Sequence, residues 1–123
     1  MFVYPRSGVE NTMRRDLKFS HDRIGTKMIY NNVILEVTEQ TDIETVHALL
    51  HRQGELSRQE PGCTRFEVYQ SQTERSLFML IERWETLEDL ERHRKATAFK
   101  EIYEPQVLPL VTRVPHPSDL VFS

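Results

Sequence analysis

The sequence predicts an α+β domain of the ferredoxin-like type, in which two helices cover one face of a four-stranded antiparallel sheet in the order βαββαβ. Three observations support this fold class. The 123 residues contain 38% hydrophobic residues and four glycines, which suits one compact domain. Along the chain, segments whose apolar residues alternate, as in strands, are followed by segments whose apolar residues have helical spacing. Capping residues and Pro or Gly mark the boundaries between them. We assign residues 28–123 to the domain and residues 1–27 to an N-terminal extension.

The first strand and first helix come directly after the extension. Met28–Val37 is rich in β-branched and aromatic residues and contains no Gly or Pro, which is typical of a strand. Thr41 followed by Glu44 has the spacing of a capping box and predicts a helix start. Apolar residues then recur at helical spacing until Pro61-Gly62 ends the helix: Ile43, Val46, Leu49, Leu50 and Leu56.

A hairpin follows this helix. Thr64–Ser71 and Ser76–Glu85 both alternate like strands, and the polar segment Gln72–Arg75 between them is short enough for a hairpin loop. Thr86 and Asp89 repeat the capping signal, so we expect a second helix from there to about Thr97.

The C-terminal part contains a further helical segment and a last strand. The helical segment begins at Ala98, and two prolines should kink or shorten it: Pro105 and Pro109. Pro115 and Pro117 should break the chain, which leaves Asp119–Ser123 as the closing strand.

Alternation assigns the strand residues to two faces of the sheet. The set expected beneath the helices is apolar throughout: Ile29, Val33, Leu35, Val37, Phe66, Val68, Leu77, Met79 and Ile81. The set expected on the open face mixes large apolar and polar residues: Tyr30, Asn32, Ile34, Arg65, Glu67, Tyr69, Phe78, Leu80, Glu82 and Trp84. Such a face needs a cover, because each large apolar side chain left in water forgoes about 1.5–3 kcal/mol. We therefore expect a homodimer that packs through its open sheet faces around a partly hydrated cavity.

Composition excludes several classes of partner. Sixteen basic and nineteen acidic residues give a net charge of −3, so neither nucleic acid nor an anionic membrane is an expected partner. No apolar stretch approaches the length of a membrane span, and residues 1–27 lack the apolar centre of a secretion signal. A single cysteine, Cys63, cannot form an intrachain disulfide, which favours the cytoplasm.

Three segments follow one another in a specific order and spacing: EPGCTRFEVY at Glu60–Tyr69, FMLIERWE at Phe78–Glu85, and the helix from Leu87 through His93 to Phe99. In these segments the chain resembles the antibiotic biosynthesis monooxygenase family of dimeric α+β barrels, and the resemblance spans residues 28–123. It implies a small homodimer. Members of the family include quinol and anthrone oxygenases that use O2 without metal or flavin, an isomerase of a phosphorylated sugar, and haem degraders.

The resemblance also implies roles for individual residues. His93 matches a helix histidine and suits a general base, Asn32 matches an asparagine that binds the substrate oxygen, and Trp84 matches a tryptophan that walls the cavity. Each has a structural alternative: an exposed imidazole, an amide bonded to backbone, and a core anchor. Further residues are expected to contact substrate: Tyr30, Tyr69, Leu80, Glu82, Phe99 and Tyr103. Buried, Glu82 could act as a base, although a salt bridge to Arg65 is the simpler expectation.

The chain departs from some members of the family. Ala98 stands where some members carry a second histidine, and Leu80 stands where the anthrone oxygenases carry asparagine. His93 and Tyr103 replace the residues expected of haem degraders, so haem chemistry is not expected. The expected function is a cofactor-independent monooxygenase that oxidises a small electron-rich aromatic with O2. The alternative is a ligand-binding or isomerase member of the same fold.

Two other groups of potentially reactive residues are not expected to form a metal site or a catalytic site. His47 and His51 lie one helical turn apart, but no third ligand is evident, so we expect a solvated helix face and no metal site. Cys63 follows Pro-Gly without a paired histidine, so we do not expect a nucleophile.

Overall fold

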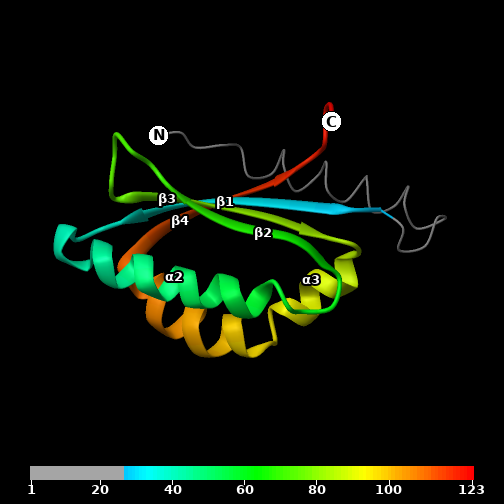
Figure 1. Cartoon of the computed structure of the whole chain (residues 1–123), viewed down its shortest axis with the longest axis horizontal. Coiled ribbons are helices and arrows are strands. Elements are labelled where there is room, and N and C mark those ends of the chain that lie inside the picture. Colours follow the sequence, from blue (N-terminus) through cyan, green and yellow to red (C-terminus); the bar gives the residue numbers. More distant parts are fainter. Residues whose placement is uncertain (1–26) are drawn as a thin grey trace.

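The computed structural model describes residues 27–123 and shows a four-stranded antiparallel sheet with helices on one face only (Figure 1). The sheet order is β2-β3-β1-β4, built from β1 (Ile29–Val37), β2 (Cys63–Gln70), β3 (Leu77–Trp84) and β4 (Val111–Ser118). The helices are α2 (Ile43–Ser57), α3 (Leu87–His93) and the π-helix η2 (Ala98–Val107), with short 3-10 turns η1 (Gln40–Asp42) and η3 (Leu108–Leu110). The predicted ferredoxin-like fold class is confirmed. The expected extension lies outside the described residues but for Lys27, so the proposed domain division stays a prediction.

The central strand β1 alternates as predicted. Its odd-numbered residues are buried beneath the helices: Ile29, Asn31, Val33, Leu35 and Val37. The even-numbered residues Tyr30, Asn32 and Ile34 are half-buried on the open face. Each residue in a strand points opposite to its neighbour, so Asn31 and Asn32 lie on different faces of the sheet.

The predicted face assignment of β3 was wrong. The buried residues are Phe78, Leu80, Glu82 and Trp84, and each lies opposite a buried residue of β1, as Leu35 lies opposite Phe78. Leu77, Met79 and Ile81, expected beneath the helices, are half-buried on the open face. Alternation could not decide between the faces, because both sets in β3 are apolar, and a shift of one residue exchanges them.

The two predicted capping signals had different outcomes. Thr86 caps α3, because its side chain accepts a hydrogen bond from the backbone N–H of Asp89 at 3.1 Å. Thr41 does not cap α2. It lies inside the 3-10 turn η1, and the N-cap residue of α2 is Asp42, whose side chain makes no capping hydrogen bond.

The C-terminal strand begins and ends earlier than predicted. Pro115 and Pro117, expected to break the chain, lie inside β4, and residues 119–123 form no strand. β4 is an edge strand, so one side of its backbone pairs with no other strand. A proline, which lacks the backbone N–H, is tolerated in such a strand. Pro105 likewise lies within η2, where the wider π-helical turn accommodates it.

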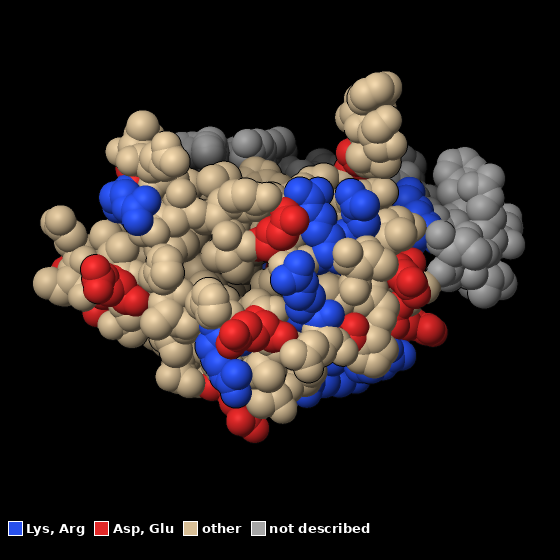
Figure 2. All heavy atoms as spheres, in the orientation of Figure 1, with Lys and Arg blue, Asp and Glu red and all other residues tan. Residues whose placement is uncertain are grey.

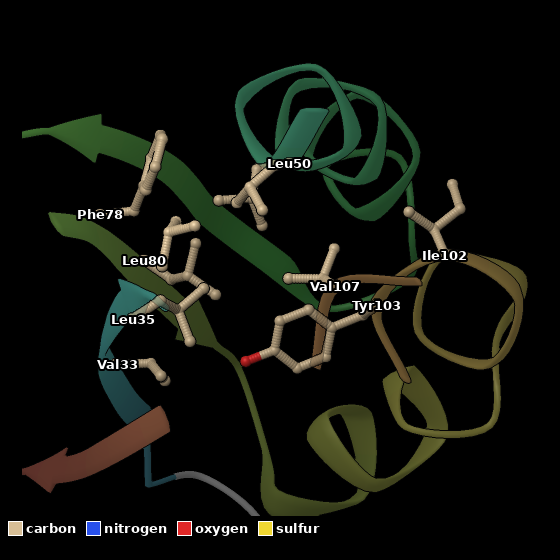
Figure 3. Packing of buried hydrophobic residues seen from close by; sticks show 10 residues of the cluster. Val33, Leu35, Leu50, Phe78, Leu80, Ile102, Tyr103 and Val107 are labelled. Atoms are coloured by element: carbon tan, nitrogen blue, oxygen red, sulfur yellow. The ribbon is translucent and has the colours of Figure 1, made fainter. Parts of the chain in front are cut away.

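The main core lies between the sheet, α2 and η2 (Figure 3). Leu50 of α2 and Val107 of η2 are fully buried and pack with the sheet residues Leu35, Phe78 and Leu80. A second, smaller cluster lies beneath α3 and contains Ile29, Phe66, Trp84 and Leu90. The candidate site adjoins this second cluster, because its histidine comes from the last residue of α3.

The turn before β2 requires glycine at position 62. Gly62 has a φ of +81°, and a Cβ there would lie 2.1 Å from the carboxylate of Asp89. We therefore expect Gly62→Ala to lower the free energy of unfolding by more than about 2 kcal/mol, since it combines backbone strain with a clash. Gly54→Ala is the matched control, because a Cβ at this helical position meets only ordinary contacts at 3.8 Å or more. Urea denaturation of both variants tests this, and equal stabilities would contradict it.

The described surface carries mixed charge. On the face shown in Figure 2, Lys and Arg side chains lie next to Asp and Glu side chains. Several make ion pairs within a helix, such as Arg92 with Asp89 and Lys100 with Glu104. Among residues 27–123, no helix is both long and apolar enough to cross a bilayer.

Candidate functional site

A buried histidine and a glutamate from a distant turn form the centre of the candidate site. His93 ends α3 and is 3% exposed, and Glu60 lies in the turn that follows α2. His93 Nδ1 and Glu60 Oε1 are 2.7 Å apart, within hydrogen-bond distance. The Glu60 side chain is 15% exposed, so it lies nearer to solvent than the imidazole does.

Burial shifts the pKa values of this pair in opposite directions. Loss of solvent, with a smaller contribution from Arg94, lowers the pKa of His93 from 6.5 to about 4. Loss of solvent, with a smaller contribution from Glu82, raises the pKa of Glu60 from 4.5 to about 7. At neutral pH the imidazole is therefore neutral, and the carboxyl group is close to its midpoint of titration.

Aromatic rings surround the imidazole of His93. The Trp84 ring lies 4.6 Å from it, centroid to centroid, at an interplanar angle of 34°. Phe66 of β2 and Phe99 of η2 lie at 5.9 and 5.7 Å. Phe99 in turn contacts Tyr103 at 5.2 Å, so a row of rings runs from α3 into η2. Such rings offer flat apolar walls beside a group that can accept a proton.

A buried carboxyl group on β3 organises a second polar cluster beside the histidine. Trp84 Nε1 donates a hydrogen bond to Glu82 Oε1 at 3.0 Å, and Asn31 Nδ2 donates to the same oxygen at 3.3 Å. Burial raises the pKa of Glu82, although these two donors and the more distant Arg113 and Arg94 lower it in part. Trp84 belongs to both clusters, because its indole N–H donates to Glu82 while its ring packs at a tilt against His93.

Tyr103 extends from η2 toward the sheet (Figure 3). Its ring points from η2 toward the strands, as Figure 3 shows, and its hydroxyl accepts a hydrogen bond of 3.0 Å from Arg113 Nε on β4. Burial raises the pKa of Tyr103, and the Arg113 guanidinium lowers it in part. The tyrosine therefore keeps its proton at neutral pH and can donate it in a hydrogen bond.

The structure brings together most of the predicted site residues but separates three. His93, Trp84, Glu82, Leu80, Phe99 and Tyr103 all lie on the helix-covered side of the sheet. Asn32, Tyr30 and Tyr69 lie on the open face. There the Asn32 amide donates to Ser118 Oγ at 3.0 Å, and Arg83 stacks on the Tyr30 ring.

Asn32 therefore cannot share a site with His93 and Trp84, which corrects the predicted trio. Its neighbour Asn31 contacts Glu82 instead. The predicted ion pair between Glu82 and Arg65 is also absent, because Arg65 pairs with Glu67 at 2.8 Å on the open face. Both errors follow from the reversed face assignment of β3.

Sequence reasoning missed three residues of the site: Glu60, Asn31 and Arg113. Glu60 stands immediately before Pro61-Gly62, which we used as a helix stop and as part of the segment that carries the family resemblance, without giving Glu60 a role. A glutamate that precedes a turn and is followed by an alternating strand gives no local sign that it meets a histidine 33 positions later. The Asn31-Asn32 pair did signal a special position, since asparagine is depleted in strands.

The remaining candidate sites carry no chemistry. Within the part of the chain that the structure describes, no group of three or more His, Cys, Asp or Glu side chains could hold a metal ion. His51 makes a contact with Glu55 on the exposed face of α2. Burial raises the pKa of the Cys63 thiol to about 11, so it is not an activated nucleophile.

Comparison with known proteins identifies the family. The sequence pattern described as "Antibiotic biosynthesis monooxygenase" matches residues 28–105, which include both polar clusters. The chain belongs to the antibiotic biosynthesis monooxygenase family. The matched range contains Asn31, Glu60, Glu82, Trp84 and His93, and it ends before Arg113 and β4. No curated protein sequence matches the chain at a significant level.

Solved structures share the fold of this family member. A conserved protein of unknown function from Bacteroides thetaiotaomicron, named as a "possible oxidoreductase", is 25% identical with a TM-score of 0.72 and covers 77% of this chain and 99% of its own. A candidate antibiotic biosynthesis monooxygenase from Nitrosomonas europaea is 20% identical with a TM-score of 0.68 and covers 76% and 91%. A protein from Pseudomonas aeruginosa is 18% identical with a TM-score of 0.69 and covers 79% and 98%. At the identities of the last two, the likeness shows the fold alone.

Proposed function

We propose that the protein is a cofactor-independent monooxygenase that oxidises a small electron-rich aromatic, such as a quinol, anthrone or polyphenol, with O2. The observation that carries this proposal is the imidazole of His93, which is buried among aromatic rings and held by Glu60. Burial lowers its pKa to about 4, so it is neutral at pH 7. A neutral imidazole can accept a proton from a phenol or an activated C–H group. The family membership and the names of the similar structures support the same class of reaction.

The reaction requires little more from the protein than a base and an apolar site. O2 reacts slowly with closed-shell molecules, but a phenolate or enolate can transfer an electron to it. Removal of a proton by His93 produces that anion. In the complete reaction the substrate gives up four electrons to O2, one oxygen atom joins the substrate carbon, and the other leaves as water. For an anthrone, a CH2 group thereby becomes a carbonyl group.

The other polar groups of the site suit binding of the substrate oxygen. The protonated hydroxyl of Tyr103, held by Arg113, can donate a hydrogen bond to an oxygen that becomes negatively charged. Trp84 and Phe99 provide the flat walls that an aromatic ring requires. We propose these residues, together with Glu82 and Leu80, as the substrate contacts.

An oxygen electrode tests the proposal directly. The full-length protein, dialysed against chelator and free of flavin absorbance, is expected to consume O2 in proportion to added quinol or anthrone, with one product oxygen derived from 18O2 by mass spectrometry. Boiled protein and substrate alone measure autoxidation. The absence of uptake above these controls across the panel of quinols and anthrones would contradict the proposal.

A second function uses the same base without oxygen. Leu80, which stands in place of an asparagine of the anthrone oxygenases, is buried in the core and offers no hydrogen bond to an oxygen. Proton transfer by His93 alone would support an isomerase or a binding protein. Product formation under argon, at the rate measured in air, would favour this function over the oxygenase.

We also propose that the open sheet face binds a second copy of the chain. Its centre carries half-buried apolar side chains from three neighbouring strands, among them Ile34, Met79, Ile81 and Val114. The Arg65–Glu67 pair lies at one side of this group. Beyond β4, Val121 and Phe122 are 96% and 88% exposed. A continuous apolar surface of this kind is typical of an interface between copies.

A charge in the centre of this face should separate the copies. We expect Ile81→Asp to shift the protein from dimer to monomer at micromolar concentration, because an unpaired carboxylate is costly in an apolar interface. Ala48→Asp is the control, since Ala48 is exposed on α2 on the other side of the molecule. Analytical ultracentrifugation measures both variants. A monomeric wild-type protein, or an Ile81→Asp variant that remains dimeric, would refute this interface.

A further inference from the structure

Glu60 is placed to do more than hold the histidine. The two side chains come from separate elements, the turn after α2 and the end of α3, and their contact is the 2.7 Å hydrogen bond. Among the hydrogen bonds of the described residues, His93 uses Nδ1 and leaves Nε2 without a protein partner. Nε2 is therefore the nitrogen available to a substrate, while Nδ1 faces the carboxyl group.

The surroundings of His93 and Glu60 favour transfer of a proton from the imidazole to the carboxyl group. His93 lies among the rings of Trp84, Phe66 and Phe99, whereas the Glu60 side chain is the more exposed of the two. An imidazolium ion among these rings would lose its hydration without gaining equal compensation. A proton taken up at Nε2 therefore has a strong tendency to leave through Nδ1.

We propose that Glu60 relays the substrate proton from His93 to solvent. This inference rests on the proposed function. His93 Nε2 accepts the proton from the substrate O–H or C–H group, and the bond between Nδ1 and its hydrogen breaks as that hydrogen passes to Glu60 Oε1. The imidazole is then neutral again, with its proton on Nε2. Glu60 then releases the proton to water. The resting state returns when Nε2 gives its proton to the reduced oxygen that leaves as water, and Nδ1 regains a proton from solvent through Glu60.

The state of Glu60 determines whether the histidine can act as a base. When Glu60 is ionised, it accepts a hydrogen bond from Nδ1–H, and the lone pair of Nε2 is free. When Glu60 is protonated, its hydroxyl donates to Nδ1, and the proton of the imidazole resides on Nε2. Because the pKa of Glu60 is raised to about 7, both states are populated at neutral pH.

Other charged groups face this pair from each packed element. Glu82 of β3 raises the pKa of Glu60, and Arg94, next to α3, lowers that of His93. Cys63 at the start of β2 is also coupled to Glu60, but its thiol stays protonated below about pH 11. Arg58, beyond the end of α2, acts on Cys63. Burial also raises the pKa of Glu82, so Glu60→Gln, which leaves Glu82 in place, separates the contributions of the two carboxyl groups.

Glu60→Gln tests the relay, because it keeps the size of the side chain and removes the acid. For the wild type we expect kcat for oxygen uptake to rise with pH through about 7. In Glu60→Gln we expect kcat at pH 8 to fall at least 10-fold, KM to change less than about 2-fold, and the limb near pH 7 to disappear. Glu60→Asp should retain that limb with a smaller loss of kcat. Glu55→Gln, an exposed change on α2, is the control.

The imidazole tautomer gives a readout that does not depend on turnover. In 15N NMR of the histidine side chains, His93 of the wild type should change from the Nε2–H to the Nδ1–H form as pH rises through about 7, and Glu60→Gln should show no such change. If the tautomer changes but no substrate supports oxygen uptake, the oxygenase proposal fails and the Glu60–His93 coupling stands. If uptake occurs but Glu60→Gln retains the wild-type kcat and pH profile, the relay is refuted.

Discussion

Replacement of His93 by Gln is expected to lower the rate of oxygen uptake by about 10²–10⁴-fold, the range that a positioned general base contributes. Glutamine retains polar atoms near Glu60 and fills part of the space between Trp84 and Phe99, so the fold should persist. It cannot accept a proton at neutral pH. The loss should therefore appear in kcat, with little change in KM, in oxygen-electrode assays at pH 8.

His51→Gln provides the control for this substitution. His51 lies on α2 with a side chain that is 69% exposed, and its Nδ1 lies 4.0 Å from a carboxylate oxygen of Glu55. The same chemical change there should leave oxygen uptake within about 2-fold of the wild type. If both variants retain full uptake, His93 is not the base, and the neighbouring carboxyl group of Glu82 becomes the residue to test.

The order of elements could be predicted from the sequence because it depends on local signals. Three such signals each determine the structure of only a few neighbouring residues: the β-branched run of β1, the helix stop at Pro61-Gly62 and the cap at Thr86. The same is true of the burial pattern of β1, where only one of the two alternating sets is strongly apolar. These local preferences agree with the final fold, and the prediction succeeded where they agreed.

The wrong face assignment of β3 shows what local sequence signals cannot determine. Phe78-Met79-Leu80-Ile81 is apolar on both faces, so only the pairing with β1 decides which residues face the helices. That pairing places Leu80 opposite Val33 and Glu82 opposite Asn31. The structure thus places the predicted histidine and tryptophan together but puts the predicted asparagine on the other face, because one position along a strand exchanges the faces.

The prolines of β4 illustrate a different limit. A proline removes a hydrogen-bond donor, which is costly in a central strand but acceptable at the edge of a sheet. Whether a strand is central or at the edge depends on the sheet order β2-β3-β1-β4, which no residue of β4 encodes by itself. Glu60 was missed for a related reason, because its meaning depends on a partner in another element.

The same pair of residues should leave a clear mark on the pH dependence of stability. The folded state holds His93 neutral down to about pH 4, whereas the unfolded chain binds a proton on it near pH 6.5. The unfolded state therefore binds more protons between these values, and stability falls as pH falls. Glu60 acts in the opposite sense. Its pKa is about 7 in the folded state and 4.5 as a free group, so the folded state binds more protons and stability rises as pH falls from 7 to 4.5.

Single substitutions should separate these opposing contributions. In Glu60→Gln only the histidine remains, and we expect the free energy of unfolding to decrease by up to about 3 kcal/mol between pH 6.5 and 4, since a difference of one pKa unit corresponds to about 1.4 kcal/mol. In His93→Gln only the glutamate remains, so stability should increase as pH falls from 7 to 4.5. Urea denaturation at one protein concentration, followed by circular dichroism, measures both slopes, and the variant that carries both substitutions shows what all other groups contribute. Parallel slopes in the two single variants would mean that burial does not shift these pKa values in opposite directions, and both the neutral base and the relay would then lose their physical basis.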